Sequence, residues 1–240
     1  MGLGRSEPVG ETPLVSDDRA IPAATAILLR DTAHGPETLM LRRNAKLDFA
    51  GGAWVFPGGK IEEEDGPGRD GDPPTGALVA AVRETEEECG LTVDQSSLVL
   101  FSRWTPPNIG QPAHTRFTTW FFAAPAPSGT VTIDGGEIHD RAWMRPADAM
   151  ERAAEREIQL LPPTWVTLHR LAALGSVEEI LTDAASSPIE HFSTVATKTD
   201  AGRTLLWHGD AGYDTADPLA DGPRHRLEIR RTGWNYLRHL

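Results

Sequence analysis

The chain has 240 residues, a formal net charge of −12 and a single cysteine, Cys89. This length allows one principal domain with an extension, and the acidic charge argues against broad nucleic-acid binding, which requires basic surfaces. Because no run of about eighteen apolar residues, no signal-peptide pattern and no cysteine pair for an internal disulfide are present, we expect a soluble cytoplasmic protein without a membrane partner.

The first segments of the chain predict an arm followed by a hairpin. Residues 1–20 are rich in glycine, proline and acidic residues and lack hydrophobic periodicity, so we expect a mobile arm. The apolar run 23–30 predicts a buried strand, and residues 38–43 predict its antiparallel partner. The second strand ends in Arg42 and Arg43.

Residues 77–89 predict a helix of three turns with one packed face and one acidic face. Glu84, Glu87 and Glu88 fall together, because residues three and four positions apart on a helix are neighbours. Three carboxylates near the carbonyl end of a helix repel one another, which favours a bound divalent cation. A solvated acidic face is the alternative. Gly90 is expected to end the helix, and the packed face comprises Leu78, Ala81, Val82, Thr85 and Cys89.

Two further strands are predicted at 98–104 and 116–123, on either side of a proline-rich loop. Arg103 and Arg116 lie at the loop ends of these strands. Guanidinium groups match phosphate oxygens, so both arginines are candidate substrate ligands. A glycine-rich loop then carries Glu137.

The remainder of the chain predicts a strand ending near Trp143, a helix over 146–158 and a packing helix over 162–174. A further helix is expected to be capped by Ser176. A hairpin is predicted around a turn at 199–202. The extension over 161–240 carries no chemical motif, and three roles stay open for it: covering a sheet edge, narrowing the substrate cleft, or forming a homodimer contact.

The glycine pair Gly58-Gly59 and the acidic helix together resemble the Nudix box, GX5EX7REUXEEXGU with U aliphatic. Three departures stand out: Asp65 replaces the glutamate of the first block, with Glu64 as an adjacent substitute, Thr85 replaces an aliphatic residue, and seventeen residues rather than seven separate Asp65 from Arg83. An insertion of this kind resembles the peroxisomal coenzyme A diphosphatase-like branch. The matching residues are Gly59, Arg83, Glu84, Glu87, Glu88, Gly90 and Leu91.

The resemblance implies an α/β fold, a Nudix α/β/α sandwich with a mixed β-sheet over 21–160, carrying a C-terminal helical and hairpin extension over 161–240. It implies metal-dependent cleavage of the diphosphate linkage of a nucleoside diphosphate derivative, such as coenzyme A, acyl-coenzyme A or ADP-ribose. Two alternatives remain on the same scaffold: a nucleotide-sensing module without turnover, and an isomerase that would need a catalytic cysteine.

The resemblance also implies roles for individual residues. Glu84, Glu87, Glu88 and the Gly58 carbonyl would hold Mg²⁺ or Mn²⁺. Arg83 would orient the glutamates through an ion pair with the acidic residue that ends the first block. Glu137 would act as general base or additional metal ligand, in competition with His139 and Asp140. Arg42 and Arg43 would approach the substrate.

Overall fold

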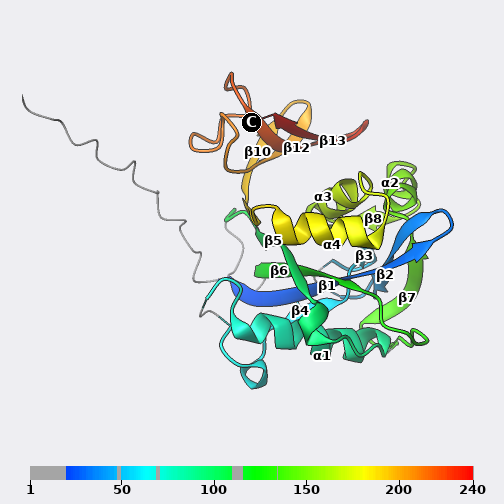
Figure 1. Cartoon of the computed structure of the whole chain (residues 1–240). Helices are drawn as coiled ribbons and strands as arrows, with labels where there is room; N and C mark the ends of the chain where they lie inside the picture. The colour runs from blue at the N-terminus through cyan, green and yellow to red at the C-terminus, as the bar shows by residue number, and fades with distance from the viewer. Residues whose placement is uncertain (1–19, 48–49, 69–70, 110–115, 134, 240) are drawn as a thin grey trace, which may run out of the picture.

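The computed structural model describes residues 20–47, 50–68, 71–109, 116–133 and 135–239 (Figure 1). A nine-stranded sheet lies between helices, and a separate four-stranded sheet follows. The first sheet comprises β1 (Ile21–Thr32), β2 (Gly35–Arg43), β3 (Ala53–Val55), β4 (Gly58–Lys60), β5 (Val99–Thr105), β6 (Phe117–Pro125), β7 (Ile138–Met144), β8 (Gln159–Leu160) and β9 (Glu190–Ser193). The predicted arm over 1–20 lies outside the described residues except for Ala20.

The helices and the second sheet complete the described chain. The α-helices are α1 (Thr75–Cys89), α2 (Pro146–Ala154), α3 (Pro162–Leu171) and α4 (Val177–Ser186), and the short 3-10 helices are η1 (Glu63–Asp65) and η2 (Gln95–Ser97). The second sheet contains β10 (Val195–Thr199), β11 (Gly202–Leu206), β12 (Arg224–Arg230) and β13 (Gly233–His239). Within the described residues no helix is both long enough and apolar enough to cross a membrane.

Strand β1 lies at the centre of the first sheet, whose strand order is β8-β3-β2-β1-β6-β5-β9. It pairs in parallel with β6 and antiparallel with β2 and with the short strand β4. Ala24 of β1 therefore lies opposite Gly59 on one side and Trp120 on the other. This register attaches the glycine turn directly to the middle of the sheet. The mixed sheet between helices confirms the predicted α/β sandwich.

Helix α1 covers one face of the sheet through small side chains. Ala77, Ala80 and Ala81 are fully buried and pack with Trp120 and Phe122 of β6. Leu78 and Val82, which also belong to the predicted packed face, are partly buried and pack against core clusters. Alanine lets the helix backbone approach the sheet closely, and the longer side chains lie at the margins of the contact.

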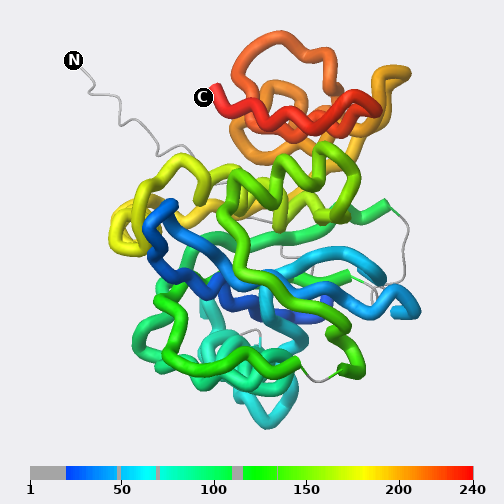
Figure 2. Tube along the Cα trace, turned by 90° about the vertical axis from the view of Figure 1, so that its right-hand side faces the viewer, coloured from blue at the N-terminus to red at the C-terminus, as the bar shows by residue number. Residues whose placement is uncertain are grey.

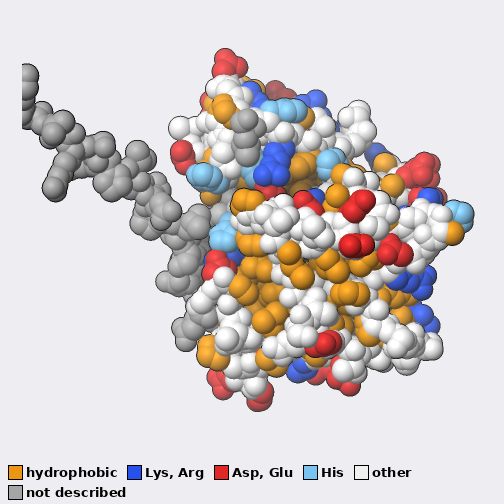
Figure 3. All heavy atoms as spheres, in the orientation of Figure 1, with side chains coloured by type: hydrophobic (Ala, Val, Ile, Leu, Met, Phe, Trp, Pro, Cys, Tyr) orange, Lys and Arg blue, Asp and Glu red, His pale blue; other side chains and the backbone are white. Residues whose placement is uncertain are grey.

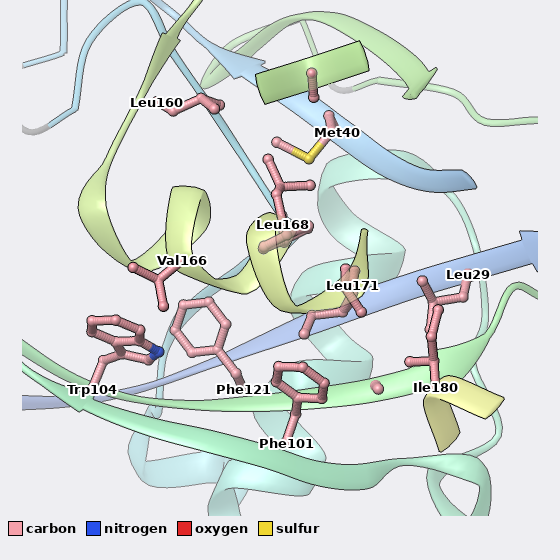
Figure 4. Close-up of a cluster of buried hydrophobic side chains, with 14 of the residues drawn as sticks. Leu29, Met40, Phe101, Trp104, Phe121, Leu160, Val166, Leu168, Leu171 and Ile180 are labelled. Atoms are coloured by element: carbon pink, nitrogen blue, oxygen red, sulfur yellow. The ribbon is translucent and has the colours of Figure 1, made fainter. Parts of the chain in front are cut away.

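Helices α3 and α4 pack on the opposite face. Figure 4 shows Leu168 and Leu171 of α3 above the sheet residues Phe101 and Phe121, and Ile180 of α4 belongs to the same core cluster. Full burial of such a side chain contributes roughly 1.5–3 kcal/mol. The boundary predicted at residue 160, between the domain and the extension, thus has residues of one shared core on both sides. That boundary stays a prediction.

The second sheet packs beside the helices, as Figures 1 and 2 show from two directions. The predicted hairpin is confirmed as β10–β11, and strands β12 and β13 extend it. The Ser176 cap is confirmed, since its Oγ accepts from the Glu179 N–H. The helix predicted over 146–158 was too long: α2 ends at Ala154, because Arg156 has a left-handed backbone with φ of 65°.

The first part of β5 lies at an edge of the sheet, because β9 pairs only with residues 102–105 of this strand. Figure 3 shows apolar side chains gathered on the molecular surface between α1 and α4, where this edge lies. Leu98, Val99 and Leu100 are partly buried there.

Candidate active site

Arg83 joins the two halves of the box across the insertion. Its Nε and Nη2 donate to Asp65 Oδ1 and Oδ2 at 2.9 and 2.7 Å, and its Nη1 donates to Glu84 at 3.0 Å and Glu87 at 3.1 Å. The Arg83 guanidinium lowers the pKa of Asp65 through this side-chain hydrogen bond. The acidic partner left open between Asp65 and Glu64 is therefore Asp65, while Glu64 is exposed.

The three glutamates of α1 differ in burial. The Glu87 side chain is 59% exposed, Glu84 is partly buried and Glu88 is only 6% exposed. Burial raises the pKa of Glu88 to about 8, against an opposing hydrogen bond from the Gly58 N–H at 2.9 Å. Burial also raises the pKa of Glu84. Two carboxylates that resist ionisation thus face the glycine turn.

Close approach explains both glycines of the turn. A Cβ at Gly59 would overlap the Glu84 carboxylate, and a Cβ at Gly58 would overlap the backbone of Ala24 and Thr25. Gly58 also has a φ of 156°, which side-chain-bearing residues rarely adopt. The absence of side chains therefore lets β4 lie between β1 and the carboxylates of α1.

The Glu137 loop is attached to the end of β2. Arg43 Nη2 lies 3.3 Å from Glu137 Oε2. Asn44 holds the same loop twice: its N–H donates to the Glu137 carbonyl at 2.7 Å, and its Nδ2 donates to the Gly136 carbonyl at 3.0 Å. The charge of Arg43 acts to lower the pKa of Glu88, and the charge of Glu137 acts to raise it.

The sequence reasoning missed Asn44. The only signal was an asparagine directly after a strand, which is typical of turns. Arg43 was among the predicted substrate-binding residues. Its Nε is buried and has no hydrogen-bond partner in the described part of the chain. Arg42, in contrast, is exposed on the same strand. The competing candidates His139 and Asp140 are exposed residues of β7.

The remaining predicted arginines make other contacts. Arg103 Nη1 lies 3.3 Å from Asp72 Oδ2 of the insertion, and its guanidinium lies over the Trp120 ring at 4.9 Å. Arg116 is buried, and its Nη2 donates to the Pro106 carbonyl at 3.0 Å. Strand register places Arg103 three strands from Gly59, about 14 Å at the usual strand spacing. Of Arg43, Arg103 and Arg116, only Arg43 contacts a predicted site glutamate, Glu137, among the residues that the structure describes. Arg103 and Arg116 contact residues outside the predicted site.

Asp72, which the sequence did not single out, docks the insertion onto the sheet. Its Oδ1 accepts from Trp120 Nε1 at 2.7 Å, and its Oδ2 lies 3.3 Å from His191 Nε2 of β9. The insertion thus packs beside the sheet and leaves the two halves of the box in contact.

The donor chemistry at α1 fits a hard divalent cation. Glu84, Glu87 and Glu88 provide carboxylate oxygens, the ligands that Mg²⁺ and Mn²⁺ prefer, and their mutual repulsion is relieved by positive charge. Among the described residues no three acidic, histidine or cysteine side chains yet converge on one point. Glu84 and Glu87 instead contact Arg83. Cation binding therefore requires their carboxylates to rotate.

Cys89 lies on the packed side of α1. It is fully buried, and its Sγ donates to the Thr85 carbonyl at 2.9 Å. Burial raises the pKa of this thiol to about 11. A buried thiol that resists ionisation is a poor nucleophile, which argues against the isomerase alternative.

Comparison with known proteins agrees with this geometry. The model of the NUDIX domain matches residues 20–163. A crystal structure of a NUDIX hydrolase from Alicyclobacillus acidocaldarius is similar over 70% of this chain and 98% of that one, with 24% identity and a TM-score of 0.61.

Two other solved structures are less similar. The MutT NUDIX hydrolase from Burkholderia pseudomallei has 20% identity and a TM-score of 0.46, covering 62% of this chain and 96% of that one. The NUDIX domain of Shewanella oneidensis NrtR, complexed with ADP ribose, has 16% identity and a TM-score of 0.47, covering 64% and 86%. No curated protein matches the chain. Because the NUDIX model matches more than half of the residues, the chain belongs to the Nudix family.

Proposed function

We propose that the protein hydrolyses the diphosphate linkage of a nucleoside diphosphate derivative, with Mg²⁺ or Mn²⁺ at the α1 carboxylates. The observation that carries this proposal is the contact of Arg83 with Asp65, Glu84 and Glu87. It keeps the hydrolytic box assembled despite the insertion.

The metal ligands would be Glu84, Glu87, Glu88 and the Gly58 carbonyl. A divalent cation bound there would neutralise charge on the diphosphate and lower the pKa of the attacking water. The Gly58 N–H, which donates to Glu88 at 2.9 Å, supports this arrangement because it fixes the orientation of the most buried carboxylate. Arg83 would orient Glu84 and Glu87 from the other side as their carboxylates rotate toward the cation.

Glu137 would accept the proton of the attacking water or bind an additional cation. Its side chain is 62% exposed, so it can reach solvent, and its loop is held next to the α1 carboxylates by Asn44. Arg43, which contacts Glu137, would contact a phosphate oxygen of the substrate. The exposed Arg42 would contact a more distant part of it.

Coenzyme A, acyl-coenzyme A and ADP-ribose are the substrates proposed for test. The insertion, docked through Asp72 onto Arg103, is the feature that supports the coenzyme A comparison. Arg103 and Arg116 would then serve a remote phosphate, provided that the substrate displaces their present contacts. Cytoplasmic location and a homodimer through the extension stay predictions, and light scattering in solution tests the second.

The decisive experiment is turnover of a panel of ADP-ribose, dinucleotides, coenzyme A and acyl-coenzyme A, with Mg²⁺, with Mn²⁺ and with chelator. We expect metal-dependent release of a product with a nucleoside 5′-phosphate group from at least one substrate. Glu87→Gln should reduce this turnover at least about 100-fold, whereas Glu86→Gln, at the adjacent exposed position, should not. Equal turnover by the two variants would show that the metal site is wrongly assigned.

A further inference from the structure

A separate cavity lies where the second sheet meets the sandwich. Its volume is about 340 Å³, and its walls come from α3, β5, β9 and β13. This volume is within the range of small-molecule sites. Tyr236, Arg238 and His239 of β13 form part of the lining, so the cavity gives the C-terminal extension a candidate role.

The floor of the cavity is aromatic. Phe101, Trp104 and Phe192 line it and are almost completely buried. The Trp104 and Phe192 rings are stacked, with centroids 3.9 Å apart. Figure 4 shows Trp104 of β5 beneath Val166 of α3, which also lines the cavity. Such a floor favours a flat, apolar group of a ligand.

Two arginines lie at the rim of the cavity, and each is paired with a carboxylate. Arg170 and Arg238 line it together with one carboxylate, Glu190. Arg170 lies over the Phe101 ring at 4.2 Å and is held by Asp183. Arg238 Nη2 lies 2.6 Å from Glu190 Oε1, and the Arg238 side chain is 47% exposed.

The two arginines lie close together in a chain with a net charge of −12. Guanidinium groups match phosphate oxygens, so a ligand anion would compete with Asp183 and Glu190 for them. Glu190 already faces Arg238 and lies 3.9 Å from His225 Nε2, so its charge is partly engaged.

We propose that this cavity binds a planar aromatic ring joined to an anionic group, with the ring on the aromatic floor and the anion at Arg238 and Arg170. A nucleoside monophosphate has this chemistry. Its selection rests on the proposed function, because hydrolysis of a nucleoside diphosphate derivative releases a nucleoside monophosphate. The extension would then sense a product of the enzyme.

Calorimetry on the full chain in the presence of chelator tests the chemistry with three probes. AMP carries both ring and anion, adenosine only the ring, and inorganic phosphate only the anion. We expect AMP to bind at least about tenfold more tightly than either part. Arg238→Gln should weaken AMP to the affinity of adenosine, whereas Arg203→Gln, at an exposed position of β11, should have no effect. Undetectable AMP binding, or equal affinity in both variants, would overturn the proposal.

A second variant locates the site. Ala173 lines the cavity and is exposed, so Ala173→Phe narrows it without changing charge. We expect this variant to keep its thermal midpoint and lose AMP binding, and we expect AMP to slow hydrogen exchange over 162–171 and 233–239 in the unaltered protein. Binding that survives Ala173→Phe but is lost in Glu87→Gln would place AMP at the active site and refute the cavity. Absence of turnover with AMP binding intact would refute only the proposed function.

Discussion

Arg83 contacts both carboxylate oxygens of Asp65, at 2.9 and 2.7 Å, although seventeen residues separate them. The short helix η1 makes this possible with an aspartate, because the Glu62 N–H donates to Asp65 Oδ2 at 2.9 Å and fixes the carboxylate in place. The same guanidinium reaches Glu84 and Glu87 with Nη1. One side chain therefore connects the first block to the proposed metal ligands.

Asp65→Asn should reduce both stability and turnover. The Asp65 side chain is 2% exposed, so its loss removes a charged partner that water cannot replace. The loss is limited because Arg83 still contacts Glu84 and Glu87 and is partly exposed to water. We therefore expect the free energy of unfolding, measured by urea denaturation, to fall by about 1–3 kcal/mol. Glu64→Gln is the control, because Glu64 is exposed and adjacent. A larger effect of the control would mean that Glu64 is the functional partner.

Gly59→Ala tests the close approach of β4 to α1. The added Cβ would overlap the Glu84 carboxylate, so the proposed ligand must move. A displacement of about 1 Å in a catalytic group costs on the order of 100-fold in rate, which is the loss of kcat/KM that we expect. Gly175→Ala is the control, since its Cβ meets only the Glu179 carboxylate, at 3.3 Å. Retained turnover in Gly59→Ala would exclude a role for Glu84 as a fixed ligand.

Local patterns in the sequence predicted much of the fold. The helix α1, its end at Gly90, the β1–β2 and β10–β11 hairpins and the Ser176 cap each depend on residues close together in the chain. The length of α2 was wrong, because Arg156 adopts a left-handed conformation that no local pattern required.

The candidate site was predictable where a motif exists and not where distant segments meet. The carboxylates of α1 follow from their spacing. The contact of Asn44 with the Glu137 loop joins residues more than ninety positions apart. The docking of Asp72 onto Trp120 and His191 likewise depends on sheet order, because β9 lies beside β5. These contacts are set by tertiary packing, which composition and periodicity do not encode.

Without metal, the protein should lose stability as the pH rises between about 4.5 and 8. Burial raises the pKa of Glu88 from 4.5 to about 8, so in this window the folded state holds a proton that the unfolded state has released. The free energy of unfolding therefore falls with pH, by at most about 1.4 kcal/mol per pH unit for one such group. Glu84, whose pKa is also raised by burial, acts in the same direction.

Urea denaturation at several pH values with chelator measures this slope. Glu88→Gln should flatten it, and Glu86→Gln should leave it unchanged. Added Mg²⁺ should also reduce the slope, because a bound cation favours the ionised carboxylate. Asp65 acts in the opposite sense, since its lowered pKa contributes stability that is lost only as the pH falls below about 4. A slope unchanged in Glu88→Gln would contradict the assignment to this carboxylate.

Asn44 should act on turnover only through Glu137. Asn44→Ala removes the Nδ2 donor to the Gly136 carbonyl and should let the Glu137 loop move away from α1, which we expect to lower kcat about tenfold. Asn44→Asp loses the same donor but keeps an oxygen that accepts from the Lys46 N–H. This variant therefore tests the loss of the contact with the Glu137 loop while the turn at residues 44–46 stays intact. Both variants should therefore lose activity to a similar extent.

A double-mutant cycle with Glu137→Gln decides whether Asn44 is a positioning residue. If Asn44 works by placing the Glu137 carboxylate, adding Asn44→Ala to Glu137→Gln should cost little more activity, because the carboxylate is already absent. A purely structural role would make the two losses multiply and would lower the thermal midpoint to match. Additive free energies of activation in this cycle would remove the Asn44 side chain from the proposed site and leave the Arg43 ion pair and the Asn44 backbone N–H as contacts that hold the Glu137 loop.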